Sequence, residues 1–237
     1  EMSLKFDFNN MFSFSVQDHG VSQQDIDEVL PQARESAQHL QKVMADPRAR
    51  VKLSLEWVNL PQQKEEDINV IVKIARQIAV KFENVLFLGI GGSYLGLKSA
   101  QDALCAPYYN EFKSLRKKSP KIYFEGNNLD PDTLSVLLKN LNPKKTFVIV
   151  ISKSGETTET KAALILTEAW LKKALGAKYG RQILAITDPE SGSLRKRVEA
   201  EQAKDPLSFR SLPLLKGVGG RYSEFNMGLI HLALLGV

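Results

Sequence analysis

The stretch "LFLGIGGSYLGLKSA", residues 86–100, has the three parts of a ligand-binding loop. Apolar residues predict a buried strand, a glycine cluster follows, and the residues after Tyr94 have helical spacing. Glycines let backbone N–H groups approach an anion, and the first turn of a helix presents unpaired N–H groups with a positive dipole end. A tight turn without a ligand would use the same residues, so this stretch alone leaves both interpretations open.

Strand and helix patterns alternate through the rest of the chain. Continuous apolar runs predict buried strands at residues 84–90, 121–126, 146–152 and 182–187. Helical patterns follow at residues 94–104, 131–140, 157–175 and 190–200. This order predicts an α/β fold with a doubly wound, mainly parallel sheet flanked by helices. In such sheets, ligands bind at the carboxyl ends of the strands.

The first part of the chain has a different pattern. Apolar positions at helical spacing predict helices over residues 22–45 and 65–82. No internal repeat or low-complexity linker interrupts the sequence. We therefore divide the chain into an amino-terminal helical segment, residues 1–66, and a ligand-binding α/β domain, residues 67–237.

Composition narrows the classes of partner. The 237 residues carry a formal net charge of +5, which is one sign of nucleic-acid binding, but the basic residues are scattered and no nucleic-acid motif accompanies them. A mild positive excess also suits an anionic small substrate. No run of 18 apolar residues is present, so no membrane span is expected. One cysteine, Cys105, and no secretory pattern predict a reducing, cytoplasmic environment.

The opening loop does not fit a nicotinamide dinucleotide. The binding fingerprint needs glycine at its first, third and sixth positions, and counting from Gly89 the sixth position is Tyr94. The acidic residue that ends the second strand, Glu125, comes later than the ~20 residues that the fingerprint expects. The three histidines have no metal-like spacing. We expect neither a nicotinamide cofactor nor a metal.

A second candidate loop lies in "VIVISKSGETTET", residues 148–160. It places five hydroxyl side chains and one lysine within nine residues at a helix start, where a plain N-cap needs one hydroxyl. The excess indicates a phosphate held by hydroxyls, backbone N–H groups and the helix dipole, although capping in a solvated loop remains open. The triphosphate P-loop pattern is absent, which favours a monophosphate. Both loops follow strands of one sheet and are expected to line one mouth.

With a third motif, these loops resemble a known family. Ser152-x-Ser154-Gly155-x-Thr157-x-Glu159 is similar to the signature loop of sugar isomerase (SIS) domains. The ordered set "GIGGSYLG", "SKSGETTET" and "GGRYS" (residues 219–223) resembles the glucose-6-phosphate isomerase family over about residues 84–237. The resemblance implies a SIS-like fold and an isomerase of glycolysis and gluconeogenesis. That enzyme class interconverts glucose 6-phosphate and fructose 6-phosphate through an enediolate.

The resemblance also implies roles for single residues. Arg221 would sit beside the reacting carbons, where a permanently charged guanidinium stabilises negative charge that develops on oxygen. Glu159 would lie near the site without acting as the base. The resemblance implies no cofactor, and a homodimer for the full-length enzyme. The positions that hold or border the sugar phosphate would be Gly91, Gly92, Ser93, Ser152, Lys153, Ser154, Thr157 and Gly220.

The chain departs from the family pattern in two ways. An acidic residue usually precedes the "GGR" and small or apolar residues follow "RYS", but here Lys216 precedes, and Glu224 and Asn226 follow. The catalytic glutamate, ring-opening histidine and late lysine of the family lie on motifs without a counterpart here. We therefore expect an amino-terminal part, cut at residue 237 and inactive alone. A non-catalytic SIS-type module that senses a sugar phosphate, or another sugar-phosphate isomerase, is the alternative.

Other residues are expected to be structural. His231 lies in the apolar run "GLIHLALLGV" and should be a packed residue of a helix. Cys105 should be buried and inert. Asn127, Asn128 and Asp130 should form a turn and cap the helix that begins at Pro131, and a contact with the ligand is the alternative.

Overall fold

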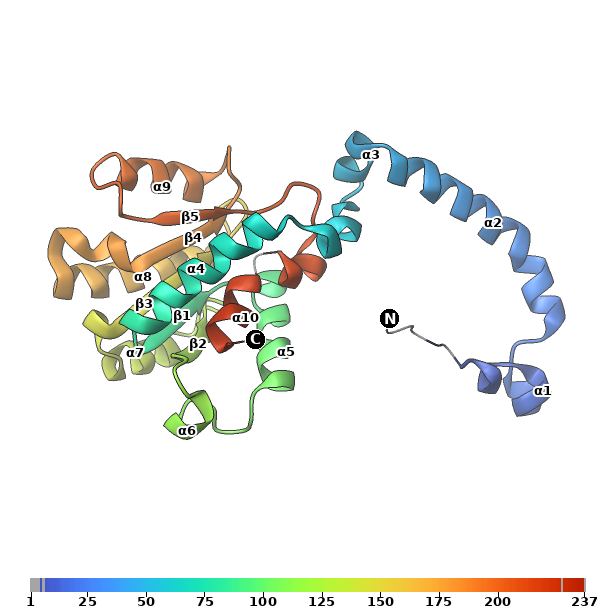
Figure 1. The fold of residues 1–237 in the computed structure, drawn as a ribbon, viewed down its shortest axis with the longest axis horizontal. Helices are drawn as coiled ribbons and strands as arrows, with labels where there is room; N and C mark the ends of the chain where they lie inside the picture. The colour runs from blue at the N-terminus through green and yellow to red at the C-terminus, as the bar shows by residue number, and fades with distance from the viewer. Residues whose placement is uncertain (1–4, 6, 227, 237) are drawn as a thin grey trace. The chain divides into compact units, whose positions relative to one another are not determined.

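The computed structural model describes residues 5, 7–226 and 228–236. Contacts within the chain define two compact units, Glu1–Arg50 and Val51–Val237. The whole sheet belongs to the second unit, and so do the three loops that the sequence singles out (Figure 1).

The first unit is built on one long helix, α2 (Gln23–Ala45). A capping box begins it: the Ser22 hydroxyl accepts from the Asp25 N–H at 3.1 Å, and the Asp25 carboxylate accepts from the Ser22 N–H at 2.8 Å. This confirms the helix predicted over residues 22–45. The short helices along the chain before and after α2 are η1 (Asn9–Met11), α1 (Ser13–Val16), η2 (Gln17–His19) and α3 (Pro47–Lys52).

Five parallel strands form the sheet of the second unit, in the order β2-β1-β3-β4-β5. Their bounds are β1 (Asn84–Leu88), β2 (Lys121–Glu125), β3 (Thr146–Ile151), β4 (Ile183–Thr187) and β5 (Arg210–Pro213). Strands β1 and β3 are neighbours, with Leu88 in register with Val150, so their carboxyl ends lie at the same edge. The predicted α/β fold with a parallel sheet is confirmed.

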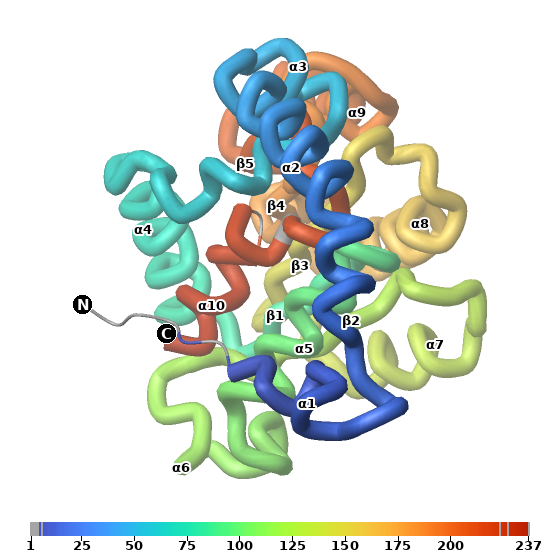
Figure 2. The backbone as a smooth tube through the Cα atoms, turned by 90° about the vertical axis from the view of Figure 1, so that its right-hand side faces the viewer, coloured from blue at the N-terminus to red at the C-terminus, as the bar shows by residue number. Residues whose placement is uncertain are grey.

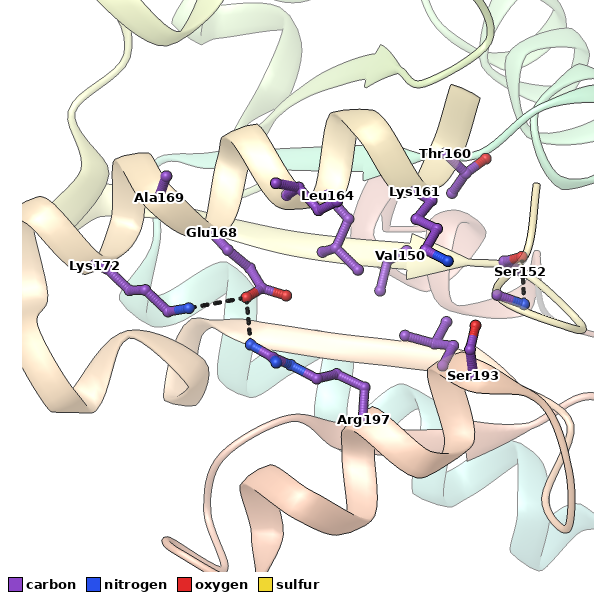
Figure 3. Close-up of a pocket in the computed structure, with 13 residues that line it drawn as sticks. Val150, Ser152, Thr160, Lys161, Leu164, Glu168, Ala169, Lys172, Ser193 and Arg197 are labelled. Atoms are coloured by element: carbon purple, nitrogen blue, oxygen red, sulfur yellow. Dashed lines mark hydrogen bonds and ion pairs between the residues drawn. The ribbon is translucent and has the colours of Figure 1, made fainter. Parts of the chain in front are cut away.

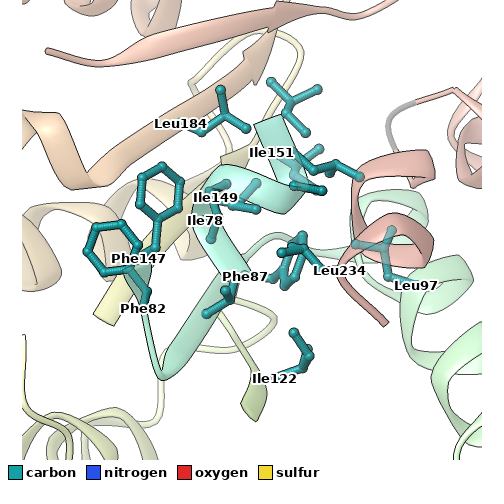
Figure 4. Packing of buried hydrophobic residues seen from close by; sticks show 14 of the residues in the cluster. Ile78, Phe82, Phe87, Leu97, Ile122, Phe147, Ile149, Ile151, Leu184 and Leu234 are labelled. Atoms are coloured by element: carbon teal, nitrogen blue, oxygen red, sulfur yellow. The ribbon is translucent and has the colours of Figure 1, made fainter. Parts of the chain in front are cut away.

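Helices cover both faces of this sheet because alternate residues of each strand point to opposite sides. Phe87 and Ile149 belong to one apolar layer, shown in Figure 4, and Leu86 and Val150 belong to the other. Figure 2 shows the strands between the two helical layers. The first layer contains α4 (Glu65–Lys81), α5 (Leu95–Leu104) and α10 (Leu229–Leu235), and the second contains α7 (Pro131–Asn140), α8 (Thr158–Leu175) and α9 (Ser193–Gln202).

Short helical turns complete the second unit. They are η3 (Glu56–Gln62), η4 (Gly91–Ser93), α6 (Lys113–Arg116), η5 (Pro143–Lys145), η6 (Gly176–Gln182) and η7 (Gly220–Phe225). Strand β5 has no counterpart in the sequence prediction, since "RSLP" is short, partly buried and pairs only with β4 at the edge of the sheet. In the described part of the chain, no helix has both the length and the apolar character needed to cross a bilayer.

Candidate functional site

The loop after β1 forms a tight helical turn rather than an open loop. Gly91 begins η4 with φ +57, a left-handed conformation that glycine adopts readily. The Tyr94 N–H donates to the Gly91 carbonyl at 3.0 Å and closes the turn, so α5 begins at Leu95. The Ser93 hydroxyl has no hydrogen-bond partner among the described residues, and it remains available to a ligand.

The "GGR" segment packs directly on this turn. A Cβ placed on Gly92 would lie 2.2 Å from the Gly220 carbonyl oxygen, so the two backbones approach more closely than any side chain allows. Gly220 opens η7, and Arg221 follows as an exposed residue. The Tyr222 ring stacks on Trp57 at 4.3 Å, which fixes the other side of η7. The sheet edge thus holds Arg221 beside the Ser93 turn.

The loop after β3 folds on its own hydroxyls. The Ser152 hydroxyl accepts from the Gly155 N–H at 3.0 Å, and the Ser154 hydroxyl accepts from the Glu156 N–H at 3.1 Å. Thr157 occupies the N-cap position of α8, yet its side chain makes no capping hydrogen bond. Two of the predicted ligand hydroxyls therefore shape the loop, while the Thr157 hydroxyl is left for another partner.

Four polar groups of these loops have no hydrogen bond or ion pair to another described residue. They are the hydroxyls of Ser93 and Thr157, the Lys153 ammonium and the Arg221 guanidinium. All four can donate hydrogen bonds, and two are cations. The loops that carry them leave the neighbouring strands β1 and β3, apart from η7, which packs on the first. An edge of this kind suits an anionic ligand.

A third loop joins the site that sequence analysis did not single out. The Ser193 N–H donates to the Ser154 carbonyl at 2.7 Å, and Gly192 takes φ +97 where a Cβ would lie 2.5 Å from that carbonyl oxygen. Before it, the Asp188 carboxylate accepts from the N–H groups of Glu190 and Ser191, both at 2.9 Å. The sequence "SGS" (residues 191–193) after the fourth strand is the signal that could have indicated this loop. Its turn delays the start of α9 to Ser193.

The electrostatics of this loop follow from those hydrogen bonds. The N–H of Glu190, followed by smaller contributions from Ser191, holds the pKa of the Asp188 carboxyl below its usual value. At the end of β2, burial raises the pKa of Glu125. Lys216, a departure from the family pattern, forms an ion pair with Glu190 at 2.6 Å and so ties the segment before the "GGR" to the β4 loop.

The two groups of predicted site residues are not joined to each other by a hydrogen bond or ion pair in the described part of the chain. Gly91, Gly92 and Ser93 form one group with Gly220 and Arg221. The other group consists of Ser152, Lys153, Ser154 and Thr157, held against the Ser193 loop. A ligand between them would have to supply the connection.

A cavity of about 480 Å³ borders the second group between α8 and α9. Ser152 and Ser193 line one end (Figure 3), and Gly155 also lines the cavity. At the other end the Glu168 carboxylate accepts from Arg197 at 2.7 Å and from Lys172 at 3.2 Å. Because its cations are already paired, this cavity is less suited to an anion than the loops above it.

Of the residues expected to be structural, His231 and the helix cap before Pro131 lie where predicted, whereas Cys105 is less buried than expected. His231 is fully buried in α10, and the Asp130 carboxylate caps α7 by accepting from the Asp132 N–H at 2.9 Å. Cys105 is only partly buried, and burial raises the pKa of its thiol, which keeps the thiol protonated. Among the described residues, no three acidic, histidine or cysteine side chains gather as a metal site.

The family comparison matches this part of the chain. The family model described as "Phosphoglucose isomerase" covers residues 73–235. The chain is 35% identical, over all of its length, to a glucose-6-phosphate isomerase of Carboxydothermus hydrogenoformans, of which it covers 48%. The chain thus spans about half the length of the curated relatives it matches.

Solved structures give the same result. A hypothetical protein from Thermus thermophilus aligns with a TM-score of 0.73 and 30% identity, over 90% of this chain and 46% of that one. A glucose-6-phosphate isomerase from Chlamydia trachomatis aligns with a TM-score of 0.54 and 26% identity, over 73% of this chain and 29% of that one. Because the family model matches residues 73–235, most of this chain, the chain belongs to the phosphoglucose isomerase family.

Proposed function

We propose that this chain is the amino-terminal, sugar-phosphate-binding part of a glucose-6-phosphate isomerase. The enzyme interconverts glucose 6-phosphate and fructose 6-phosphate through an enediolate, a step of glycolysis and gluconeogenesis. The observation that carries the proposal is the close approach of Gly92 to Gly220. It supports a site in which an unpaired arginine and a hydroxyl-bearing turn face the same ligand.

In this proposal, the loop after β3 binds the phosphate. Ser152, Ser154 and Thr157 offer hydroxyls at the start of α8, where the helix dipole and backbone N–H groups favour an anion. The hydroxyls of Ser152 and Ser154 accept from backbone N–H groups, and each keeps its own hydrogen to donate to a phosphate oxygen. Ser93 and Lys153 border the same ligand, with Gly91, Gly92 and Gly220 allowing the backbone close approach.

Arg221 acts on the reacting carbons rather than on the phosphate. Isomerisation moves a proton between two neighbouring carbons. As the proton leaves the first carbon, negative charge develops on oxygen. A guanidinium keeps its charge at any working pH, and this one is not neutralised by a carboxylate among the described residues. A module that only senses a sugar phosphate has no need of such a cation. We assign no residue of this chain as the base.

We also propose where the functional domain begins, how the full-length enzyme is assembled and which cofactors it does without. The functional α/β domain begins near residue 67, after an amino-terminal helical segment of residues 1–66. The full-length enzyme is a cytoplasmic homodimer. It needs no nicotinamide cofactor, because Tyr94 stands where the dinucleotide fingerprint requires glycine. It needs no metal, because the three histidines have no metal-like spacing.

Calorimetric titration tests the ligand class. The protein should bind glucose 6-phosphate and should not measurably bind glucose at the same concentration, because the β3 loop selects the phosphate. Inorganic phosphate serves as the control for binding through the anion alone. Equal affinity for glucose and glucose 6-phosphate would contradict the proposal.

A further inference from the structure

Glu224, which departs from the family pattern, is largely buried at the base of the Arg221 turn. Its side chain is 14% exposed, and it sits between two glycines. A Cβ on Gly96 would lie 3.0 Å from its Oε2, and a Cβ on Gly228 would lie 2.5 Å from the same atom. Both carboxylate oxygens are buried, and neither has a hydrogen-bond partner among the described residues. A buried carboxylate without a donor is costly, so its nearest polar neighbour decides how it is stabilised.

That neighbour is His231 on α10. Its Nδ1 lies 3.9 Å from Glu224 Oε1, and this nitrogen is also buried without a hydrogen-bond partner in the described part of the chain. The Nε2 atom lies 3.1 Å from Gln101 Oε1 on α5. An amide oxygen only accepts, so Nε2 carries a hydrogen and donates it. Phe87 and Phe124 pack around the ring, with centroids at 5.5 and 5.6 Å.

The hydrogen on Nε2 determines what Nδ1 can do. In a neutral imidazole with its hydrogen on Nε2, the Nδ1 lone pair would face the Glu224 carboxylate, and two acceptors would meet in an apolar site. A second hydrogen on Nδ1 removes this conflict, because the imidazolium then faces the carboxylate as an ion pair. This second hydrogen is a proton taken from solvent, so the pair takes up one proton in total.

We propose that Glu224 and His231 form a buried carboxylate–imidazolium pair that holds η7 against α10 and so positions Arg221. Arg221 and Glu224 are three residues apart in one 3₁₀ turn, where such residues lie on the same side. The Gln101 contact extends the link to α5, the helix that follows the Ser93 turn. Glu224 is therefore a positioning residue, and its effect on turnover rests on the proposed function, whereas the charge state of the pair does not.

NMR of the ring nitrogens tests the pair itself. In ¹⁵N-histidine-labelled protein at pH 7.5, both ring nitrogens of His231 should carry hydrogen. His19→Gln and His39→Gln, at exposed positions, identify the other signals. Glu224→Gln keeps the side-chain volume and offers an N–H to Nδ1, so His231 should become neutral. A neutral His231 in the wild type, or an unchanged cation in Glu224→Gln, would overturn the pair.

Tryptophan fluorescence tests the positioning without any activity. In a Trp170→Phe background, Trp57 is the remaining emitter, and it stacks on Tyr222 next to Arg221. Glu224→Leu removes the pair and should shift the Trp57 emission, whereas Glu224→Gln should leave it nearly unchanged. Glu199→Leu, at an exposed position on α9, is the matched control. An emission that does not respond to Glu224→Leu would overturn the positioning role.

Steady-state kinetics of the full-length protein then separates this role from general destabilisation. Glu224→Leu should lower kcat about 10-fold with KM unchanged, since a small displacement of Arg221 affects the transition state more than substrate binding. Glu199→Leu should retain wild-type kcat. A kcat for Glu224→Leu equal to that of Glu199→Leu would overturn the positioning of Arg221. A wild-type protein without isomerase activity would instead contradict the proposed function, and the NMR and fluorescence results would still decide the pair.

Discussion

Gly92→Ala should separate the Ser93 turn from the Arg221 turn. The new Cβ would lie 2.2 Å from the Gly220 carbonyl oxygen, 2.3 Å from its carbon and 2.4 Å from its Cα. All three are backbone atoms, so no side-chain rotation relieves the overlap. Ordinary contact begins near 3.4 Å, and the two turns must therefore move apart by about 1 Å.

The same geometry gives the size of the effect. Overpacking of this kind costs about 1–3 kcal/mol of stability. A displacement of about 1 Å at a catalytic group lowers the rate about 100-fold. We expect Gly92→Ala to lower the unfolding free energy by about 1–3 kcal/mol in urea titrations. In a coupled assay of the full-length protein, the same variant should lower kcat about 100-fold.

Gly220→Ala is the matched control for this prediction. A Cβ on Gly220 would lie 3.4 Å from Gly92 Cα and 3.7 Å from its nitrogen, which is ordinary van der Waals contact. This variant should keep an unfolding free energy close to that of the wild type. An equal loss of unfolding free energy in both variants, or wild-type kcat in Gly92→Ala, would refute the contact between the two turns.

Three further predictions concern single side chains. Arg221→Ala should lower kcat about 100- to 1,000-fold, while Thr157→Ala should act first on KM; steady-state kinetics that showed the reverse would move Arg221 to the phosphate site. The lowered pKa of Asp188 stabilises the fold only while the carboxyl is ionised, so the stability advantage of wild type over Asp188→Asn should be full at pH 6 and vanish as the pH falls through the folded pKa, below about 3.9. In urea titrations, an advantage that grew on acidification would contradict this. Arg197→Met should cost about 1–2 kcal/mol of unfolding free energy because two largely buried carboxylates each lose a partner, whereas Lys145→Met, at an exposed ion pair, should change little; equal effects would contradict the role of burial.

Sequence patterns predicted most of the sheet because burial on both faces leaves a strong signal. Strands β1, β3 and β4 are buried along their whole length, and only continuous apolar runs can occupy such positions. Strand β5 lies at the edge and is partly buried, so its residues are not constrained in this way. Its pairing depends on the neighbouring strand rather than on its own composition.

The site was predictable only in part, for a similar reason. The residue types of the β1 and β3 loops indicate an anion site from local chemistry alone, since five hydroxyls at one helix start exceed what capping needs. The approach of Gly92 to Gly220 and the meeting of Glu224 with His231 join residues from separate segments. No local pattern marks such pairs, because each depends on how the chain packs in three dimensions.

A crystal structure of the full-length protein with fructose 6-phosphate bound tests the central claim most directly. We expect phosphate oxygens within about 3 Å of the hydroxyls of Ser152, Ser154 and Thr157, and the Arg221 guanidinium closer to the sugar C1 and C2 than to the phosphorus. A phosphate bound to Arg221, or one bound beside Lys172 in the cavity between α8 and α9, would contradict the account.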